Sequence, residues 1–237
     1  MRLDLFILKK YQLKSRTYAS QLIKRGKVFV NNKIIYKVSE NVNEQDDITI
    51  DLSENYASQG AFKLKKAIDY FSISIDDKIC ADFGCSNGGF TDILLKNNAK
   101  HVYAFDVADC ALDKMILASK NVTFIKCNLR YLPENTPKVD FLCCDVSFIS
   151  LTLIIPSIFR ILNNKGEGII LIKPQFEAGK KYINKSGIVK DKKIHEKVIS
   201  NIMDCLKTHQ LKPINIITSP IYYEDKNIEY LLYFKKD

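Results

Sequence analysis

Short apolar segments alternate with amphipathic segments from residue 62 to the end of the chain, and this alternation limits the possible folds more than any other feature. The apolar segments predict strands over 79–83, 101–106, 122–126, 139–144, 168–172, 213–218 and 228–235. The amphipathic segments predict helices over 62–71, 88–97, 110–118, 151–163 and 192–207. This pattern is typical of an α/β fold with a doubly wound, mostly parallel, seven-stranded sheet. The last two strands have no helix between them, which predicts a β-hairpin with its turn near 220–227.

The beginning of the chain has a different pattern. Helices are expected over 3–9 and 16–25, the second capped by Ser15 and ended by Gly26. A hairpin over 27–35, which turns at Asn31 and Asn32, and a strand over 48–52 should follow. These elements predict a small α+β domain over 1–52, a linker over 53–60 and the α/β domain over 61–237.

Positive charge is concentrated in the first domain. Residues 1–39 contain ten Lys and Arg against one acidic residue, Asp4, whereas residues 40–237 contain 26 basic and 26 acidic residues. The whole formal charge of +9 therefore comes from one short segment. Such a segment suits a polyanion, either a nucleic acid or a membrane surface, unless its lysines are only a solvated face.

Several classes of protein are disfavoured. No stretch approaches 18 uncharged apolar residues, as a membrane span would require, and the first residues have a charge where a signal peptide has its apolar core. The seven cysteines include no Cys-x-x-Cys pair, and the three histidines are scattered. We therefore expect a cytoplasmic protein with reduced thiols and no metal site.

A glycine-rich segment lies between the first predicted strand of the α/β domain and the helix after it, with the sequence Asp82-Phe83-Gly84-Cys85-Ser86-Asn87-Gly88-Gly89-Phe90-Thr91. Glycines there would let a ligand approach the backbone beside a helix N-terminus. Their spacing differs from the Gly-x-Gly-x-x-Gly of dinucleotide sites. Asp106 ends the second strand, where a carboxylate can accept hydrogen bonds from ribose hydroxyls. Together these features favour a nucleoside-bearing cofactor, although a tight turn and a strand-end cap would explain them as well.

Two charged residues directly follow buried strands: Asp145 after 139–144 and Lys173 after 168–172. Ligands of open α/β sheets bind outside the carboxyl ends of the strands. A lysine after an apolar run is costly unless it is paired. Asp145 and Lys173 could therefore be an acid and a base beside the cofactor, or only a structural ion pair.

The motifs of this chain resemble those of the TlyA family, 2′-O-ribose methyltransferases of ribosomal RNA that are sometimes named haemolysins. Residues 2–50 resemble an S4 RNA-binding domain, and residues 58–237 resemble a Rossmann-like FtsJ-type methyltransferase domain. The matching motifs are Gly84-x-Ser86-x-Gly88-Gly89-Phe90-Thr91-Asp92, Asp145-Val146-Ser147-Phe148-Ile149-Ser150, Lys173-Pro174-Gln175-Phe176-Glu177, Ser219-Pro220-Ile221 and Asn227-x-Glu229.

The resemblance implies S-adenosylmethionine as cofactor, ribosomal RNA as partner and the 2′-hydroxyl of a cytidine as target. The large ribosomal subunit is the expected source of that RNA, with the small subunit as an alternative, and a monomer is the favoured state. The implied catalytic tetrad is Lys63, Asp145, Lys173 and Glu229. The implied cofactor-binding residues are Asp82, Gly84, Ser86, Gly88, Gly89, Phe90, Asp106, Asn128 and Asp145. The basic residues expected to contact RNA are Arg2, Arg16, Lys24, Arg25 and Lys33.

In this scheme Lys173 removes the 2′ proton or stabilises the alkoxide, while Asp145 and Glu229 hold both lysines in place. The chain departs from the family pattern at Gln59, Ala61, Ala108, Leu129 and in the segment 222–226, which lacks the usual glycines. The changes near the expected RNA face leave a second hypothesis open, a non-catalytic RNA-binding or ribosome-assembly factor. A pore-forming haemolysin has no amphipathic or spanning segment to support it.

Overall fold

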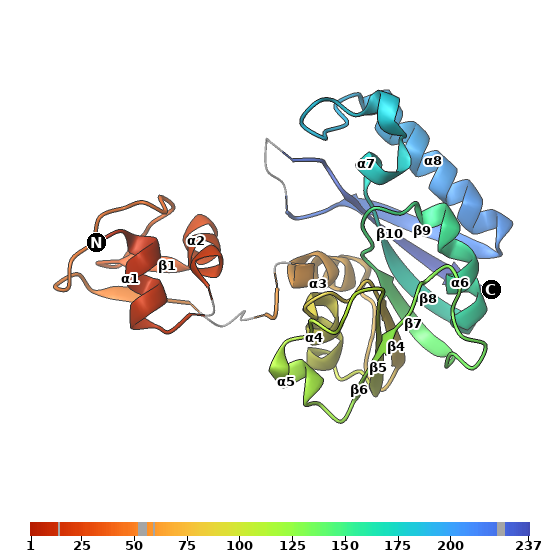
Figure 1. The fold of residues 1–237 in the computed structure, drawn as a ribbon, viewed down its shortest axis with the longest axis horizontal. Coiled ribbons are helices and arrows are strands. Elements are labelled where there is room, and N and C mark those ends of the chain that lie inside the picture. Colours follow the sequence, from red (N-terminus) through yellow and green to blue (C-terminus); the bar gives the residue numbers. More distant parts are fainter. Residues whose placement is uncertain (14, 52–55, 59, 222–225) are drawn as a thin grey trace. The chain divides into compact units, whose positions relative to one another are not determined.

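The computed structural model describes residues 1–13, 15–51, 56–58, 60–221 and 226–237. Its contacts divide the chain into two compact units, Met1–Asn55 and Tyr56–Asp237 (Figure 1). The linker predicted over 53–60 lies partly outside the described residues, and the exact domain limits stay a prediction.

The first unit contains two helices and a small antiparallel sheet. Its elements are α1 (Leu3–Lys10), α2 (Arg16–Lys24), β1 (Val28–Val30), β2 (Lys33–Ile34) and β3 (Ile48–Ile50), and the strand order is β2-β1-β3. One apolar cluster, which includes Leu3, Ile7, Ile23 and Val28, fills the space between helices and sheet. The elements predicted for this part of the chain are confirmed to within a few residues.

Local sequence signals set the ends of α2 and the first hairpin. The Ser15 hydroxyl accepts a hydrogen bond from the amide of Tyr18 at 3.1 Å and so caps the helix. Gly26 has a φ of +69°, and its amide donates to the carbonyl of Ile23, which ends the helix as predicted. Asn31 and Asn32 have φ values of +50° and +62°, the left-handed pair that a two-residue hairpin turn requires.

The second unit contains one seven-stranded sheet. Its strands are β4 (Ile79–Phe83), β5 (His101–Asp106), β6 (Val122–Lys126), β7 (Val139–Cys144), β8 (Leu162–Ile172), β9 (Leu211–Thr218) and β10 (Tyr230–Lys236). The order is β6-β5-β4-β7-β8-β10-β9, in which only β10 runs antiparallel to its neighbours. The predicted mostly parallel sheet and the β9–β10 pairing are confirmed. Part of the predicted turn, residues 222–225, lies outside the described residues.

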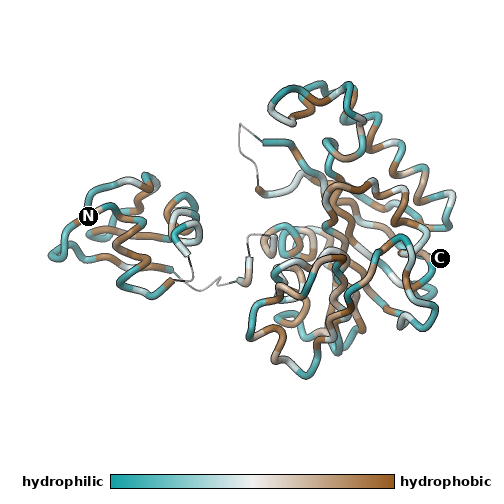
Figure 2. Tube along the Cα trace, in the orientation of Figure 1, coloured by the Kyte–Doolittle hydropathy of each residue, from teal (hydrophilic) through white to brown (hydrophobic). Residues whose placement is uncertain are grey.

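Helices cover both faces of this sheet (Figure 1). The helices are α3 (Gly60–Phe71), α4 (Gly89–Lys96), α5 (Lys114–Leu117), α6 (Ile155–Ile161), α7 (Pro174–Glu177) and α8 (Lys192–Thr208), with 3₁₀ turns η1 (Leu151–Leu153) and η2 (Lys180–Tyr182). One apolar cluster joins α3 and α4 to the sheet, and another joins α6 and α8 to it. Figure 2 shows the hydrophobic strands between more hydrophilic helices and loops. The sheet is therefore doubly wound, as predicted.

Two predicted helices are shorter than expected, and one strand is longer. Helix α5 replaces the helix predicted over 110–118, because the carboxylate of Asp113 accepts from the amide of Met115 and starts the helix there. The helix predicted over 151–163 is divided into η1 and α6, and Pro156 lies at the first turn of α6. Strand β8 starts at Leu162 rather than 168, because Leu162 pairs with Val139. The polar residues 163–166 form a bulge between the pairs Leu162–Val139 and Glu167–Phe141, and Lys165 in this bulge has a φ of +62°.

The sequence also predicted reduced thiols, no metal site and no membrane span. All seven cysteines are free thiols, and Cys80, Cys85, Cys143 and Cys144 are buried. Within the described ranges no group of three or more His, Cys, Asp or Glu side chains could hold a metal ion. No described helix is long and apolar enough to span a membrane.

Candidate active site

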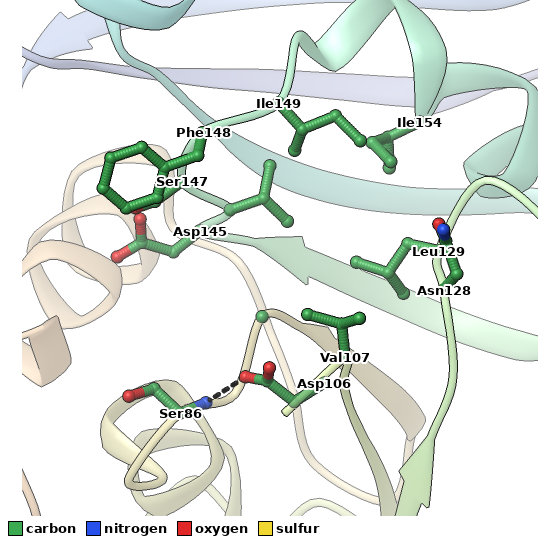
Figure 3. Close-up of a pocket in the computed structure, with 12 residues that line it drawn as sticks. Ser86, Asp106, Val107, Asn128, Leu129, Asp145, Ser147, Phe148, Ile149 and Ile154 are labelled. Carbon is green, nitrogen blue, oxygen red and sulfur yellow. Dashed lines mark hydrogen bonds between the residues drawn. The ribbon is translucent and has the colours of Figure 1, made fainter. Parts of the chain in front are cut away.

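Two adjoining cavities open at the carboxyl ends of β4, β5, β7 and β8. The larger, of about 540 Å³, is lined by Asp106, Asn128 and several apolar side chains (Figure 3). The smaller, of about 270 Å³, is lined by Lys63, Lys173, Gly89 and Phe90 among others. The residues common to both linings are Gly84, Ser86, Asp145 and Ser147. A ligand in the larger cavity would therefore share one wall with the lysines of the smaller.

Gly84 and Gly88, in the segment after β4, lie where a side chain would clash with neighbouring atoms. Gly84 has a φ of +82°, and a Cβ there would lie 2.8 Å from the carbonyl oxygen of Asp145. Gly88 has a φ of +90°, and a Cβ there would lie 2.7 Å from Cδ1 of Ile116. Gly84 lines both cavities, whereas Gly88 lines neither and instead lets α4 start close to α5. Two predicted cofactor residues thus differ in position: Gly84 meets the cavities, and Gly88 shapes the loop beneath them.

Asp106 presents a fixed carboxylate to the larger cavity. Its Oδ2 accepts from the amide of Ser86 at 2.9 Å, and its Oδ1 accepts from the amide of Ala108 at 3.0 Å (Figure 3). A carboxylate has about four acceptor positions, so two remain for hydroxyl donors. Asn128 lines the same cavity, and its Oδ1 accepts from the amide of Arg130 at 3.0 Å. The strand-end cap and the ligand-binding role considered for Asp106 are therefore compatible.

Asp82 lies away from both cavities, although it was predicted to bind the cofactor. Its carboxyl is fully buried and accepts a 2.6 Å hydrogen bond from the hydroxyl of Thr91. Burial raises the pKa of Asp82 to about 7, against the opposing effect of the Thr91 hydrogen bonds. The structure thus shows Asp82 joining β4 to the first turn of α4.

The four residues of the predicted tetrad meet at the smaller cavity. Lys63 Nζ, on α3, lies 2.7 Å from Oε2 of Glu229 and 3.6 Å from Oδ2 of Asp145. Lys173 Nζ, at the end of β8, lies 2.6 Å from Oδ1 of Asp145. The charges therefore alternate as Glu229, Lys63, Asp145 and Lys173. The side chains are only 9–18% exposed, so each charge depends on its neighbours rather than on water.

The electrostatics of this cluster keep Lys63 protonated. Burial lowers the pKa of Lys63, but the carboxylates of Asp145 and Glu229 outweigh it, so the pKa is raised overall. Lys173 also donates a 2.8 Å hydrogen bond to the hydroxyl of Ser147. Among the described residues, Oδ1 of Asp145 accepts no well-aligned hydrogen bond, although Lys173 lies beside it. In the smaller cavity, the amine of Lys173 is thus held by Asp145 and Ser147, two residues that line both cavities.

Phe148 lies in the segment after β7, and no function was predicted for it from the sequence. Its side chain lines the larger cavity and is 90% exposed, with a φ of +63°. The ring centroid lies 5.0 Å from that of Phe176, which follows β8. A bulky residue in the left-handed region is unusual and points to a functional constraint. The available signal was an aromatic residue next to Ser147, four residues after the buried strand that ends at Cys144.

Glu177 is a second residue that sequence reasoning did not assign. Its Oε2 accepts from the hydroxyl of Ser150 at 2.6 Å, and its Oε1 accepts from the amide of Leu151 at 2.8 Å. Burial raises the pKa of Glu177, although both hydrogen bonds oppose the shift. Glu177 therefore connects the segment after β7 to the segment after β8, and so fixes Asp145 relative to Lys173.

The predicted RNA-binding residues belong to the first unit. Arg2 Nε and Arg16 Nε lie 3.1 Å and 2.8 Å from the two carboxylate oxygens of Asp4, which is buried. Burial raises the pKa of Asp4, but the two arginines lower it more, so Asp4 stays ionised. Lys33 is exposed on β2, and Lys24 and Arg25 lie at the end of α2. The structure brings together Arg2 and Arg16, around a carboxylate that the sequence analysis counted only as a charge.

Comparisons with known proteins agree with this architecture. The FtsJ-like methyltransferase family matches residues 56–236, and the S4 domain matches residues 1–48. Hemolysin A of Brachyspira hyodysenteriae is 38% identical and covers 99% of each chain. The 16S/23S rRNA (cytidine-2′-O)-methyltransferase TlyA of Mycobacterium tuberculosis is 30% identical, over 99% of this chain and 89% of the relative.

A solved structure extends the likeness to three dimensions. A protein from Streptococcus thermophilus with a provisional hemolysin name is 34% identical, with a TM-score of 0.75, over 100% of this chain and 88% of that one. The resemblance inferred from the motifs is confirmed. The chain belongs to the FtsJ-like methyltransferase family, in the TlyA-type form that joins an S4 domain to the methyltransferase domain.

Proposed function

We propose that this protein transfers a methyl group from S-adenosylmethionine to the 2′-hydroxyl of a cytidine in ribosomal RNA. One observation carries the proposal: the ion-paired cluster of Lys63, Asp145, Lys173 and Glu229 is joined through Asp145, which lines both cavities, to a nucleoside-sized cavity. A hydroxyl is a weak acid, and its attack on carbon benefits from a positioned base or cation. The cluster supplies both kinds of group.

The larger cavity suits the cofactor. Asp106 offers acceptors for the two ribose hydroxyls, and the loop at Gly84 lets a ligand approach the backbone. Val107, Leu129 and Ile149 give the cavity apolar walls that suit a purine ring. When bound, S-adenosylmethionine supplies an electrophilic methyl group on a sulfonium.

The chain's own residues divide the remaining work. Lys173 is proposed to take the 2′ proton or to stabilise the developing alkoxide, since it lines the smaller cavity and its amine contacts Asp145 and Ser147, which line both cavities. Lys63, kept protonated, holds Asp145 and Glu229, and Asp145 in turn orients Lys173. Precise placement of the nucleophile is a large part of such catalysis. All four groups come from one chain, which favours a monomer.

Phe148 is proposed to stack on the base of the target nucleotide. The exposed ring projects beside the cavities and is supported from one side by Phe176. Stacking of a base on an aromatic side chain contributes about 1–3 kcal/mol and tolerates any base. An unstacked nucleotide would then present its ribose, rather than its base, to Lys173.

The first unit is proposed to supply RNA affinity. Ten of the 36 basic residues lie within residues 1–39, and Arg2 and Arg16 are held side by side by Asp4. Phosphate contacts of this kind give affinity without sequence specificity. We place the activity in the cytoplasm, with large-subunit RNA as the first substrate to test and small-subunit RNA as the alternative.

The decisive experiment measures transfer of tritiated methyl groups to unmodified 23S and 16S ribosomal RNA, followed by mapping of the 2′-O-methyl positions. We expect incorporation at a cytidine ribose that disappears with the Lys173→Met variant. A folded protein that binds S-adenosylmethionine and RNA but transfers no methyl group would instead support the non-catalytic assembly factor.

A further inference from the structure

A second basic segment lies in the methyltransferase domain, where the charge of residues 40–237 sums to zero. Residues 180–193, called here the lysine loop, contain six lysines against one acidic residue, Asp191. The loop starts at η2 and ends in the first turn of α8. Its lysines, all exposed, are Lys180, Lys181, Lys185, Lys190, Lys192 and Lys193.

Among the residues that the structure describes, these lysines have no carboxylate partners. Within the described part of the chain, none of the six ammonium groups lies within 4.0 Å of a carboxylate, unlike Lys63 and Lys173 in the active site. Asp191 caps α8 instead, because its Oδ1 accepts from the amide of Lys193 at 2.8 Å. The loop therefore presents a concentrated positive charge to solvent.

The loop has a defined conformation. Oδ1 of Asn184 accepts from the amides of Ser186 and Ile188, both at 2.9 Å. The amide of Asn184 also donates to the carbonyl of Ile188 at 3.0 Å. Gly187, with a φ of +78°, allows the turn between them and has no neighbouring atom within 4 Å of an added Cβ. The lysines around this turn are thus attached to an ordered backbone with open space beside it.

Hydrogen bonds attach the loop to the segment that carries Glu229. The amide of Val189, which is buried, donates to Oδ1 of Asn227 at 2.9 Å, and its carbonyl accepts from Nε2 of His195 at 2.8 Å. Nδ1 of His195 is 2.8 Å from the hydroxyl of Tyr230, the residue after Glu229. Figure 1 shows the loop after α7 extending beside the β9–β10 hairpin. The lysine loop is therefore attached to the edge of the sheet at which the active site lies.

We propose that the lysine loop binds the phosphate backbone of the RNA strand that flanks the target nucleotide. The inference rests on the proposed function, because that RNA is its substrate. Phosphodiesters match unpaired ammonium groups, and lysine contacts to phosphate add affinity whatever the sequence. The RNA then has two basic contact surfaces on this chain, one in each unit, and the loop belongs to the unit that contains the tetrad.

The test compares two triple variants of the full-length chain that remove equal charge. Lys180→Ala, Lys185→Ala and Lys190→Ala change the loop. Lys100→Ala, Lys120→Ala and Lys212→Ala change exposed lysines at the opposite edge, near the start of β5, β6 and β9. Binding to unmodified 23S RNA is measured at several KCl concentrations without cofactor. Each lost phosphate contact should reduce the slope of log K against log salt by about 0.7, so the loop variant should lose about 2.

We expect the loop variant to bind RNA roughly tenfold more weakly at 0.1 M KCl, and the opposite-edge variant to behave like the wild type. S-adenosylmethionine affinity should be unchanged for both. A triple Lys→Gln variant of the loop repeats the test if the alanine variant is unstable.

Equal affinities and slopes for the two triple variants would overturn the proposal. So would a loop variant that keeps its RNA binding but loses binding to phosphatidylserine vesicles, since the loop would then be a membrane contact. Binding is measured without methyl transfer, so the result applies even if the wild-type protein transfers no methyl group. Failure of the proposed function and failure of the lysine loop are thus distinguishable.

Discussion

Replacing Lys173 by alanine tests the proposed mechanism most directly. The change removes the amine that lies 2.6 Å from Oδ1 of Asp145 and 2.8 Å from the hydroxyl of Ser147. Asp145 keeps a second lysine, Lys63, at 3.6 Å, and so is not left as an isolated buried charge. The loss of folding free energy should therefore be about 1–3 kcal/mol, the cost of an unmatched buried group, rather than that of an unpaired ion.

The kinetic effect should be larger than the structural one. A positioned acid–base group contributes about 100-fold or more, which corresponds to roughly 2.7 kcal/mol of transition-state stabilisation. Because Lys173 is expected to act mainly on the transition state, affinities for cofactor and RNA should change far less. Lys173→Arg should not restore the rate, since a guanidinium stays protonated and differs in shape.

The assay is single-turnover transfer of tritiated methyl groups to unmodified ribosomal RNA with protein in excess, alongside calorimetry for cofactor binding and urea unfolding. Lys78→Ala is the matched control, because Lys78 also lies 2.7 Å from a largely buried carboxylate, Glu167, but before β4 at the far edge. Lys173→Met, which keeps the apolar stem, replaces the alanine variant if that variant unfolds. A folded Lys173 variant that methylates the same ribose at near wild-type rate would refute the mechanism.

Four further changes test other parts of the site. Asp106→Ala should weaken S-adenosylmethionine binding by ~1–3 kcal/mol, because ribose hydroxyls lose their acceptor; unchanged affinity by calorimetry would remove it from the cofactor site. Asp82, whose pKa is raised from 3.8 to about 7, holds its proton more tightly when folded, so stability should fall as pH rises between these values. Asp82→Asn should reduce this dependence of the unfolding free energy on pH, as measured by urea unfolding. An unchanged pH dependence would contradict a raised pKa of Asp82. Phe148→Ala should lower RNA methylation about tenfold through KM or rate while cofactor binding persists, and full activity would exclude stacking. Asp4→Asn should release Arg2 and Arg16, with which it pairs, and so weaken RNA binding in filter assays, while methyl transfer at saturating RNA stays intact. An RNA affinity equal to that of the wild type would count against a role of these two arginines in RNA binding.

Local interactions let the sequence predict much of this protein. A hydroxyl cap at Ser15, a left-handed glycine at Gly26 and apolar runs such as 139–144 act within a few residues of the chain, so they can be recognised without a fold. The side chains at strand ends, Asp106 and Asp145 among them, could be placed near a ligand because parallel strands end at a common edge. The tetrad itself was predicted from the family resemblance.

The tertiary structure decided what depends on distant partners. The family resemblance implied Asp82 as a cofactor-binding residue, yet its carboxyl is buried, accepts a hydrogen bond from Thr91 and lines neither cavity. Strand β8 begins before residue 168 because Leu162 and Glu167 pair with Val139 and Phe141 of β7, and the polar residues between these pairs form a bulge. The lysine loop was hidden because a net charge averages over 198 residues, whereas the electrostatic field of a surface depends on which charges lie together and unpaired. Hydrogen bonds over long sequence separations, such as that between Val189 and Asn227, place that charge beside Glu229, and no local pattern encodes them.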